Sequence, residues 1–307
     1  MDTNISAARA FIKNSVLPDT FFAKLSILLA SISMLSLLVH AVEYGLSDTF
    51  TLLLDWYETL LNKVLGWLGA ILVFALELIS RLISINISLQ PHWQHVFVLM
   101  NIYFLRDALF YRTSKHLNVN RSNWHLTLGL LLAVLASCAS GSINDDGTSL
   151  ISSILVAVFP VSGILIYDLV ERHWFVRHYA KADEFTQHGI SNRQAAKFYR
   201  QKILERAVGL LLSSVITVLI SRNWIGLGEG VGIIALLVSM LLISIYWISG
   251  RASLYYQFVG SKDDSSPFLY KLLFRSGTSE LGSIMLGTFF WLAVFLVFNA
   301  GLGLSGL

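Results

Sequence analysis

Seven segments of this chain are apolar over about 20 residues each, and this pattern limits the available folds more than any other feature. A helix of that length crosses roughly 30 Å of hydrocarbon. Hydrophobic residues make up 55% of the chain and charged residues only 13%, against roughly 25% charged in soluble domains. We therefore predict an all-α integral membrane protein that forms one domain over residues 1–307. The seven segments are 21–44, 64–84, 125–142, 150–170, 207–222, 230–249 and 280–300.

The distribution of Lys and Arg predicts how these segments are threaded, because cytoplasmic loops are enriched in both residues. An eighth segment, 95–111, carries the adjacent pair Arg106 and Asp107, which favours the membrane interface over a span. With the N-terminus in the cytoplasm, 20 of the 22 basic residues then lie inside, and only Lys63 and Arg222 lie outside. If 95–111 spans instead, the N-terminus and about five basic residues lie outside. We expect the first arrangement, in a bacterial inner membrane, with the C-terminus outside.

Two segments between the spans are amphipathic, and we expect both to lie at the membrane interface. Residues 49–63 place Asp55, Glu58 and Asn62 on one helical face, at the outer side. Residues 252–275 carry several Tyr and Phe side chains, which are typical of the interface, at the inner side.

Residues 172–206 are predicted to form a cytoplasmic helical hairpin that extends from the spans at 150–170 and 207–222. Gly189 suits the end of the first helix, and Ser191 with Gln194 suits the start of a second helix at Asn192. The outer face of the hairpin is basic. It is a candidate site for a protein partner or an anionic ligand, with contact to lipid headgroups as the alternative. Its residues are Arg177, Lys181, Arg193, Lys197 and Arg200.

The titratable residues at the start of this hairpin do not form a metal site. His173 and His178 are five residues apart, so they point to different sides of a helix and cannot share one ion. Asp168 has the i,i+4 spacing of an ordinary ion pair with Arg172. We therefore expect neither a metal nor another cofactor, and the single cysteine, Cys138, excludes an intrachain disulfide.

Three acidic residues are candidates for a pore or an ion path, because a carboxylate facing lipid is costly. They are Glu77, Asp168 and Glu171. Glu77 is the strongest of the three, since it lies well inside the apolar segment 64–84. The alternatives are a hydrogen-bonded packing residue and a carboxylate that reaches the interface together with Arg81.

Small residues at four-residue spacing allow helices to approach closely, either within the chain or between copies of it. Such spacing joins Ser283 to Gly287 and Gly66 to Ala70. A homo-oligomer is therefore one possible state of the protein.

These features predict a channel or transport subunit, or a scaffold of a membrane complex, whose partners are the bilayer and whatever binds the basic hairpin. No catalytic motif is present, and no nucleic-acid partner is expected. The alternative is a membrane enzyme acting at the inner face on a lipid-linked or phosphate-bearing substrate. It would use Asp168, Glu171, His173 and Arg177, with Arg112 and Arg121 near the phosphate.

Overall fold

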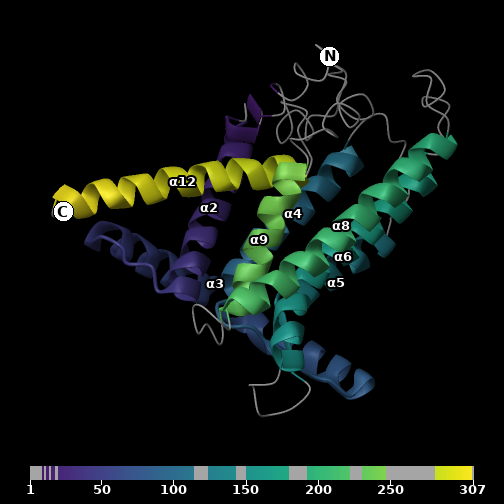
Figure 1. Ribbon diagram of the computed structural model, residues 1–307, viewed down its shortest axis with the longest axis horizontal. Helices are drawn as coiled ribbons and strands as arrows, with labels where there is room; N and C mark the ends of the chain where they lie inside the picture. The colour runs from purple at the N-terminus through teal and green to yellow at the C-terminus, as the bar shows by residue number, and fades with distance from the viewer. Residues whose placement is uncertain are drawn as a thin grey trace.

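The computed structural model describes residues 9, 12–13, 15–17, 20–113, 124–142, 150–179, 192–221, 230–246 and 281–305. Over these residues the chain is a bundle of helices with one pair of short strands (Figure 1). The elements are α2 (Phe21–Val42), α3 (Asp48–Ile83), β1 (Asn86–Leu89), α4 (Trp93–Thr113), α5 (Trp124–Ser137), β2 (Ala139–Ser142), α6 (Leu150–Tyr179), α8 (Asn192–Ile220), α9 (Val231–Tyr246) and α12 (Leu281–Ser305).

The helical class predicted from the sequence is confirmed, and five of the described helices contain a stretch long and apolar enough to cross a membrane. Two other described helices are apolar but shorter, at Leu126–Ser137 and Val231–Ile245. The number of seven spans therefore stays a prediction. The five long stretches are Phe21–Val42, Asp48–Ile83, Leu150–Val170, Ile203–Ile220 and Ile284–Gly303.

The bundle has two groups of helices that share α9. Helix α6 packs against α5, α8 and α9, and helix α2 packs against α4, α9 and α12 (Figure 1). Helix α2 begins after Thr20, whose hydroxyl accepts a hydrogen bond from the Ala23 amide at 3.2 Å. It ends at Val42, and the next residue, Glu43, adopts a left-handed conformation with φ of 50°.

Helix α4 lies inside the bundle, although the sequence placed its segment at the membrane interface. Its buried stripe follows the helical period and packs against α2, α5 and α12. Arg106, the reason for the interface prediction, is itself only 9% exposed. The local charge pair is therefore a poor guide to the position of this helix. The fully buried side chains of the stripe are Val96, Leu99, Met100, Tyr103 and Phe104.

The apolar segment predicted over 125–142 is not helical throughout, because α5 ends at Ser137 and β2 follows it. Strand β2 pairs with β1 in antiparallel register, with Asn86 opposite Ser142. The amide of Gln90 adds a hydrogen bond to the Cys138 carbonyl at 3.0 Å. The strand pair joins the C-terminal end of α5 to the segment that follows α3.

Helix α3 begins and ends at the same end of the bundle. Its first residue, Asp48, follows the C-terminal end of α2 by a short turn. After the last residue of α3 the chain enters β1, which pairs with β2 at the C-terminal end of α5. His92 follows β1, and its ring stacks on that of His40 of α2, with centroids 3.7 Å apart. Helix α3 therefore lies across one end of the bundle, the lower end in Figure 1.

Glycines at three helix contacts leave no room for a side chain. A Cβ on Gly163 of α6 would overlap Ser137 and the Ala133 carbonyl of α5, and one on Gly232 of α9 would lie 2.6 Å from the Val156 carbonyl oxygen. A Cβ on Gly287 of α12 would similarly overlap the Ser15 carbonyl oxygen and contact the Ile27 side chain. Gly66 of α3, by contrast, faces open space in the described part of the chain.

Candidate functional site

A buried ion pair joins α6 and α8, the two helices that flank the predicted hairpin, in the described part of the chain. The Arg206 guanidinium of α8 donates from Nη1 to Oδ1 of Asp168 on α6. Asp168 is 1% exposed and Arg206 is 4% exposed, so both charges are removed from solvent. Such a pair costs desolvation energy, which is repaid only when its partners are held in good geometry.

Arg206 is a described partner of Asp168. The side chain of Arg172, the partner expected from the i,i+4 spacing, lies outside the described residues, so that pair stays a prediction. The i,i+4 rule that suggested Arg172 considers one helix alone, whereas α6 and α8 return past each other and bring residues 38 positions apart into contact. The neighbouring residue, Tyr167, stacks on Phe104 of α4 with ring centroids 4.5 Å apart. The membrane-proximal end of the predicted hairpin is thus fixed to both α8 and α4.

Glu77 lies on an exposed face of α3. It makes no hydrogen bond or ion pair with another residue of the described part of the chain, Arg81 included. No described helix encloses it in an internal path, and its role in conduction stays a prediction.

The basic residues of the predicted hairpin are only partly within the described part of the chain. Arg177 lies in the helical backbone of α6, as does Glu171, while Arg193, Lys197 and Arg200 lie in that of α8. The side chains of these residues, and Lys181 as a whole, lie outside the described residues. Their role in binding therefore stays a prediction.

A polar cluster that was not predicted joins α2, α3 and α4 at the end crossed by α3. Oε1 of Glu58 accepts a hydrogen bond from Ser36 Oγ at 2.8 Å and lies 2.9 Å from His40 Nε2. His95 Nε2 lies 3.6 Å from the same oxygen and 3.1 Å from Ser36 Oγ. Glu58 was recognised only as part of an amphipathic face. The sequence feature that could have indicated its partners is the position of His40 and His95, each at the end of an apolar segment.

The geometry of this cluster suits an anchor for α3 better than a catalytic group. Ser36 is 0% exposed, so its hydroxyl is not accessible to a substrate. Glu58 and Ser36 both approach the same His95 nitrogen, whereas a nucleophilic triad uses opposite nitrogens of the imidazole. Two more hydrogen bonds hold α3. One joins the hydroxyls of Tyr57 and Ser33 at 2.7 Å, and in the other Gln94 Nε2 donates to Asn62 Oδ1 at 3.0 Å.

No group of three or more His, Cys, Asp or Glu residues in the described ranges is arranged to hold a metal ion. The cluster around Glu58 is therefore a hydrogen-bonded arrangement of a carboxylate, a hydroxyl and two imidazoles.

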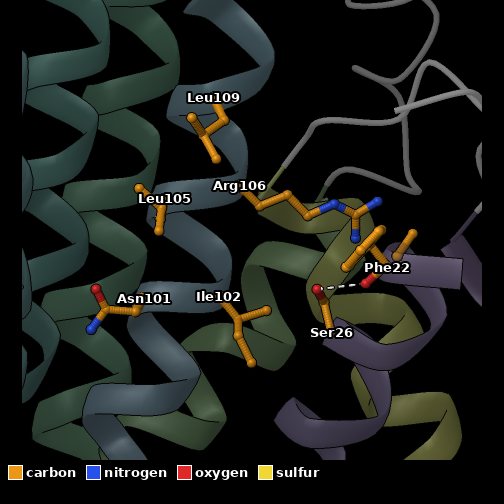
Figure 2. A pocket seen from close by; sticks show the side chains of 8 residues that line it. Phe22, Ser26, Asn101, Ile102, Leu105, Arg106 and Leu109 are labelled. Carbon is orange, nitrogen blue, oxygen red and sulfur yellow. Dashed lines mark hydrogen bonds between the residues drawn. The ribbon is translucent and has the colours of Figure 1, made fainter. Parts of the chain in front are cut away.

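Two mainly apolar cavities lie on either side of the N-terminal half of α2. The first, of about 220 Å³, lies between α2 and α4 and has Arg106 in its wall (Figure 2). The second, of about 410 Å³, lies between α2 and α12 and includes Lys24 and Trp291. Each combines hydrocarbon walls with one cationic side chain.

The sequence matches no known protein-family profile, and no curated protein or solved structure shows significant similarity to it.

Proposed function

We propose that this chain is a non-catalytic subunit of a membrane complex, a scaffold or transport component, that docks an acidic partner through the basic hairpin of α6 and α8. The observation that supports this most is the buried pair of Asp168 and Arg206. It ties the two helices together where the basic segment begins. A hairpin held at its base presents its charges in a fixed arrangement, which lowers the entropic cost of binding.

We further propose that seven helices cross the membrane, namely α2, α4, α5, α6, α8, α9 and α12, while α3 lies along the outer surface. This differs from the threading expected from the sequence, because the second span is α4 and not the segment 64–84. The burial of α4 and the position of both ends of α3 at one end of the bundle support it. The threading keeps 19 of the 22 basic residues at the inner side, with only Lys63, Arg81 and Arg222 outside. The N-terminus is then cytoplasmic and the C-terminus is outside.

The three faces of α3 suit a helix that lies in the plane of the membrane. One face packs on the bundle through Leu54, Tyr57 and Leu61. A second face is exposed and apolar, which fits contact with lipid, and includes two tryptophans of the kind found at interfaces. A third face is polar and would meet water. The exposed apolar side chains are Leu52, Trp56, Leu60, Val64, Trp67, Ile71, Phe74, Leu78 and Leu82, and the polar ones include Thr51, Asp55, Asn62 and Glu77.

The same ion pair disfavours the enzymatic alternative at the inner face. Asp168 is buried against Arg206, so it is not available to a substrate at the membrane surface. Docking is the function that uses the hairpin without requiring a free carboxylate there.

A charge-reversal experiment tests the docking function. The full-length protein with K197E and R200E would be affinity-purified from its native membranes after crosslinking, beside the wild type. We expect the double variant to lose its acidic crosslinked partner. The matched control is K63E with R81E, which makes the same change in charge on α3. Equal recovery of crosslinked partners by the wild type and by K197E/R200E would refute docking through the hairpin.

A further inference from the structure

We propose that the cavity between α2 and α12 holds an acyl chain of an anionic phospholipid from the inner leaflet, whose phosphate binds the exposed Lys24 ammonium at the start of α2. The proposal depends on the membrane location and threading proposed above, but not on docking by the hairpin. It concerns a different part of the molecule from the Asp168–Arg206 pair.

The walls of the cavity are hydrocarbon over almost their whole surface. Six of the eight residues that line it have no polar atom in the side chain. The seventh, Trp291, has one polar group, and its indole Nε1 donates to the Val16 carbonyl at 3.1 Å. A polar solute would therefore find few hydrogen-bonding partners here, whereas a hydrocarbon chain fits the walls. The six apolar residues are Val16, Leu17, Phe21, Leu25, Ile27 and Leu28.

The cavity can be reached from outside the bundle. Three of its wall residues, Phe21, Leu25 and Leu28, have the spacing of one helical face of α2, and all three are exposed. Leu17, in the segment before the helix, is exposed as well. In a protein that crosses a membrane, such exposed apolar side chains fit contact with lipid. One acyl chain can therefore enter between α2 and α12 while the rest of the lipid stays in the bilayer.

Close contacts between α12 and the start of the chain define the walls. A Cβ on Gly287 would lie only 2.1 Å from the Ser15 carbonyl oxygen, so the two backbones touch. Ser31 Oγ of α2 donates to the Thr288 carbonyl at 3.2 Å. The volume of the cavity, about 410 Å³, is within the roughly 300–1,000 Å³ typical of ligand pockets. Because these contacts form the cavity in advance, ordering a bound chain costs less entropy.

Lys24 supplies the charge that selects an anionic headgroup. Its side chain is exposed and makes no ion pair or hydrogen bond with another described residue, so its ammonium is open to a phosphate. No other residue that lines the cavity is charged. A lysine binds phosphate as a point charge and is attracted to the anionic lipids of the inner leaflet.

The position of Lys24 along α2 suits contact with a headgroup. It is three residues after Phe21, the first residue of the helix, which is about 4.5 Å along the axis. The proposed threading places this end of α2 at the cytoplasmic side. A lysine near the end of a span can extend its ammonium to the level of the phosphates while its methylene groups remain beside the apolar walls.

The proposal can be tested by native mass spectrometry of the full-length protein in detergent. The protein would be titrated with phosphatidylglycerol or with phosphatidylethanolamine of identical acyl chains, and separately with glycerol phosphate as a headgroup without chains. We expect the wild type to bind phosphatidylglycerol about fivefold more tightly than phosphatidylethanolamine. K24Q should bind the two lipids equally, and K24R should keep the preference. K63Q, the same change at an exposed lysine of α3, should behave as the wild type.

A second variant tests the hydrocarbon part of the site. L28W would narrow the cavity and should weaken the binding of both lipids. Its control is L211W, the same change on the exposed face of α8, which should bind both lipids as the wild type does. Circular dichroism would verify that each variant is folded.

The proposal is refuted if K24Q keeps the preference for phosphatidylglycerol. It is also refuted if L28W binds both lipids as the wild type does, or if glycerol phosphate competes as well as the complete lipid. Loss of partner capture by K197E/R200E is a separate result, so failure of either proposal can be recognised without the other.

Discussion

Arg206 of α8 donates a hydrogen bond to the carboxylate of Asp168 on α6, and both side chains are buried. The two residues are 38 positions apart, yet they bring together the two helices on either side of the predicted hairpin. Several consequences of this and of the other contacts can be measured.

Removal of one member of the pair should destabilise the protein strongly. Asp168→Ala leaves a buried guanidinium without its carboxylate, and we expect the free energy of unfolding to fall by about 3–5 kcal/mol. Thermal unfolding of the purified protein in detergent would report this as a lower Tm. Arg81→Ala, at a residue of α3 with no ion pair to another described residue, should change the stability by less than about 0.5 kcal/mol. A Tm for Asp168→Ala equal to that of the wild type would show that the pair does not support the fold.

The polar cluster should hold the first half of α3 on the bundle. Glu58→Ala removes the acceptor shared by Ser36 and His40, and we expect a loss of about 1–3 kcal/mol together with faster hydrogen–deuterium exchange over residues 48–62. Asp55→Ala is a matched control, because Asp55 lies one turn away on the exposed face of the same helix. If both variants exchange at the same rate as the wild type, Glu58 is not an anchor.

The two ends of α3 should be accessible from the same side of the membrane. Single cysteines introduced at Gly45 and Pro91, in a Cys138→Ala background, should both react with a membrane-impermeant maleimide added to intact cells. A cysteine at Gln187 in the predicted hairpin should react only after permeabilisation. Reaction at only one of Gly45 and Pro91 would mean that α3 crosses the bilayer.

Glycine substitutions should separate packed positions from open ones. Gly163→Ala forces a Cβ against α5, and we expect a loss of about 1–3 kcal/mol from overpacking. Gly66→Ala meets no described neighbour and should be neutral or stabilise α3 by up to about 1 kcal/mol, since alanine favours a helix. Thermal unfolding of both variants gives the comparison, and equal effects would contradict the packing at Gly163.

The apolar segments were predictable because a helix long enough to cross hydrocarbon is a local property of the sequence. The span predicted at 21–44 is α2, and a helix does begin at Asn192 as the capping residues indicated. The position of α4 was not predictable in this way. A side chain that packs in a membrane bundle and one that faces lipid are equally apolar, so hydropathy cannot distinguish Leu99, which is buried, from Leu105, which is exposed.

The sequence by itself determined that this chain is helical and apolar enough for a membrane, and that most of its basic charge is concentrated in a few segments. Only the tertiary structure decided that Asp168 pairs with Arg206, that Glu58 meets two histidines, and that both ends of α3 lie at one end of the bundle. The physical reason is the same in each case. Composition and periodicity depend on neighbours in the chain, whereas the partner of a buried charge depends on which helices pack together.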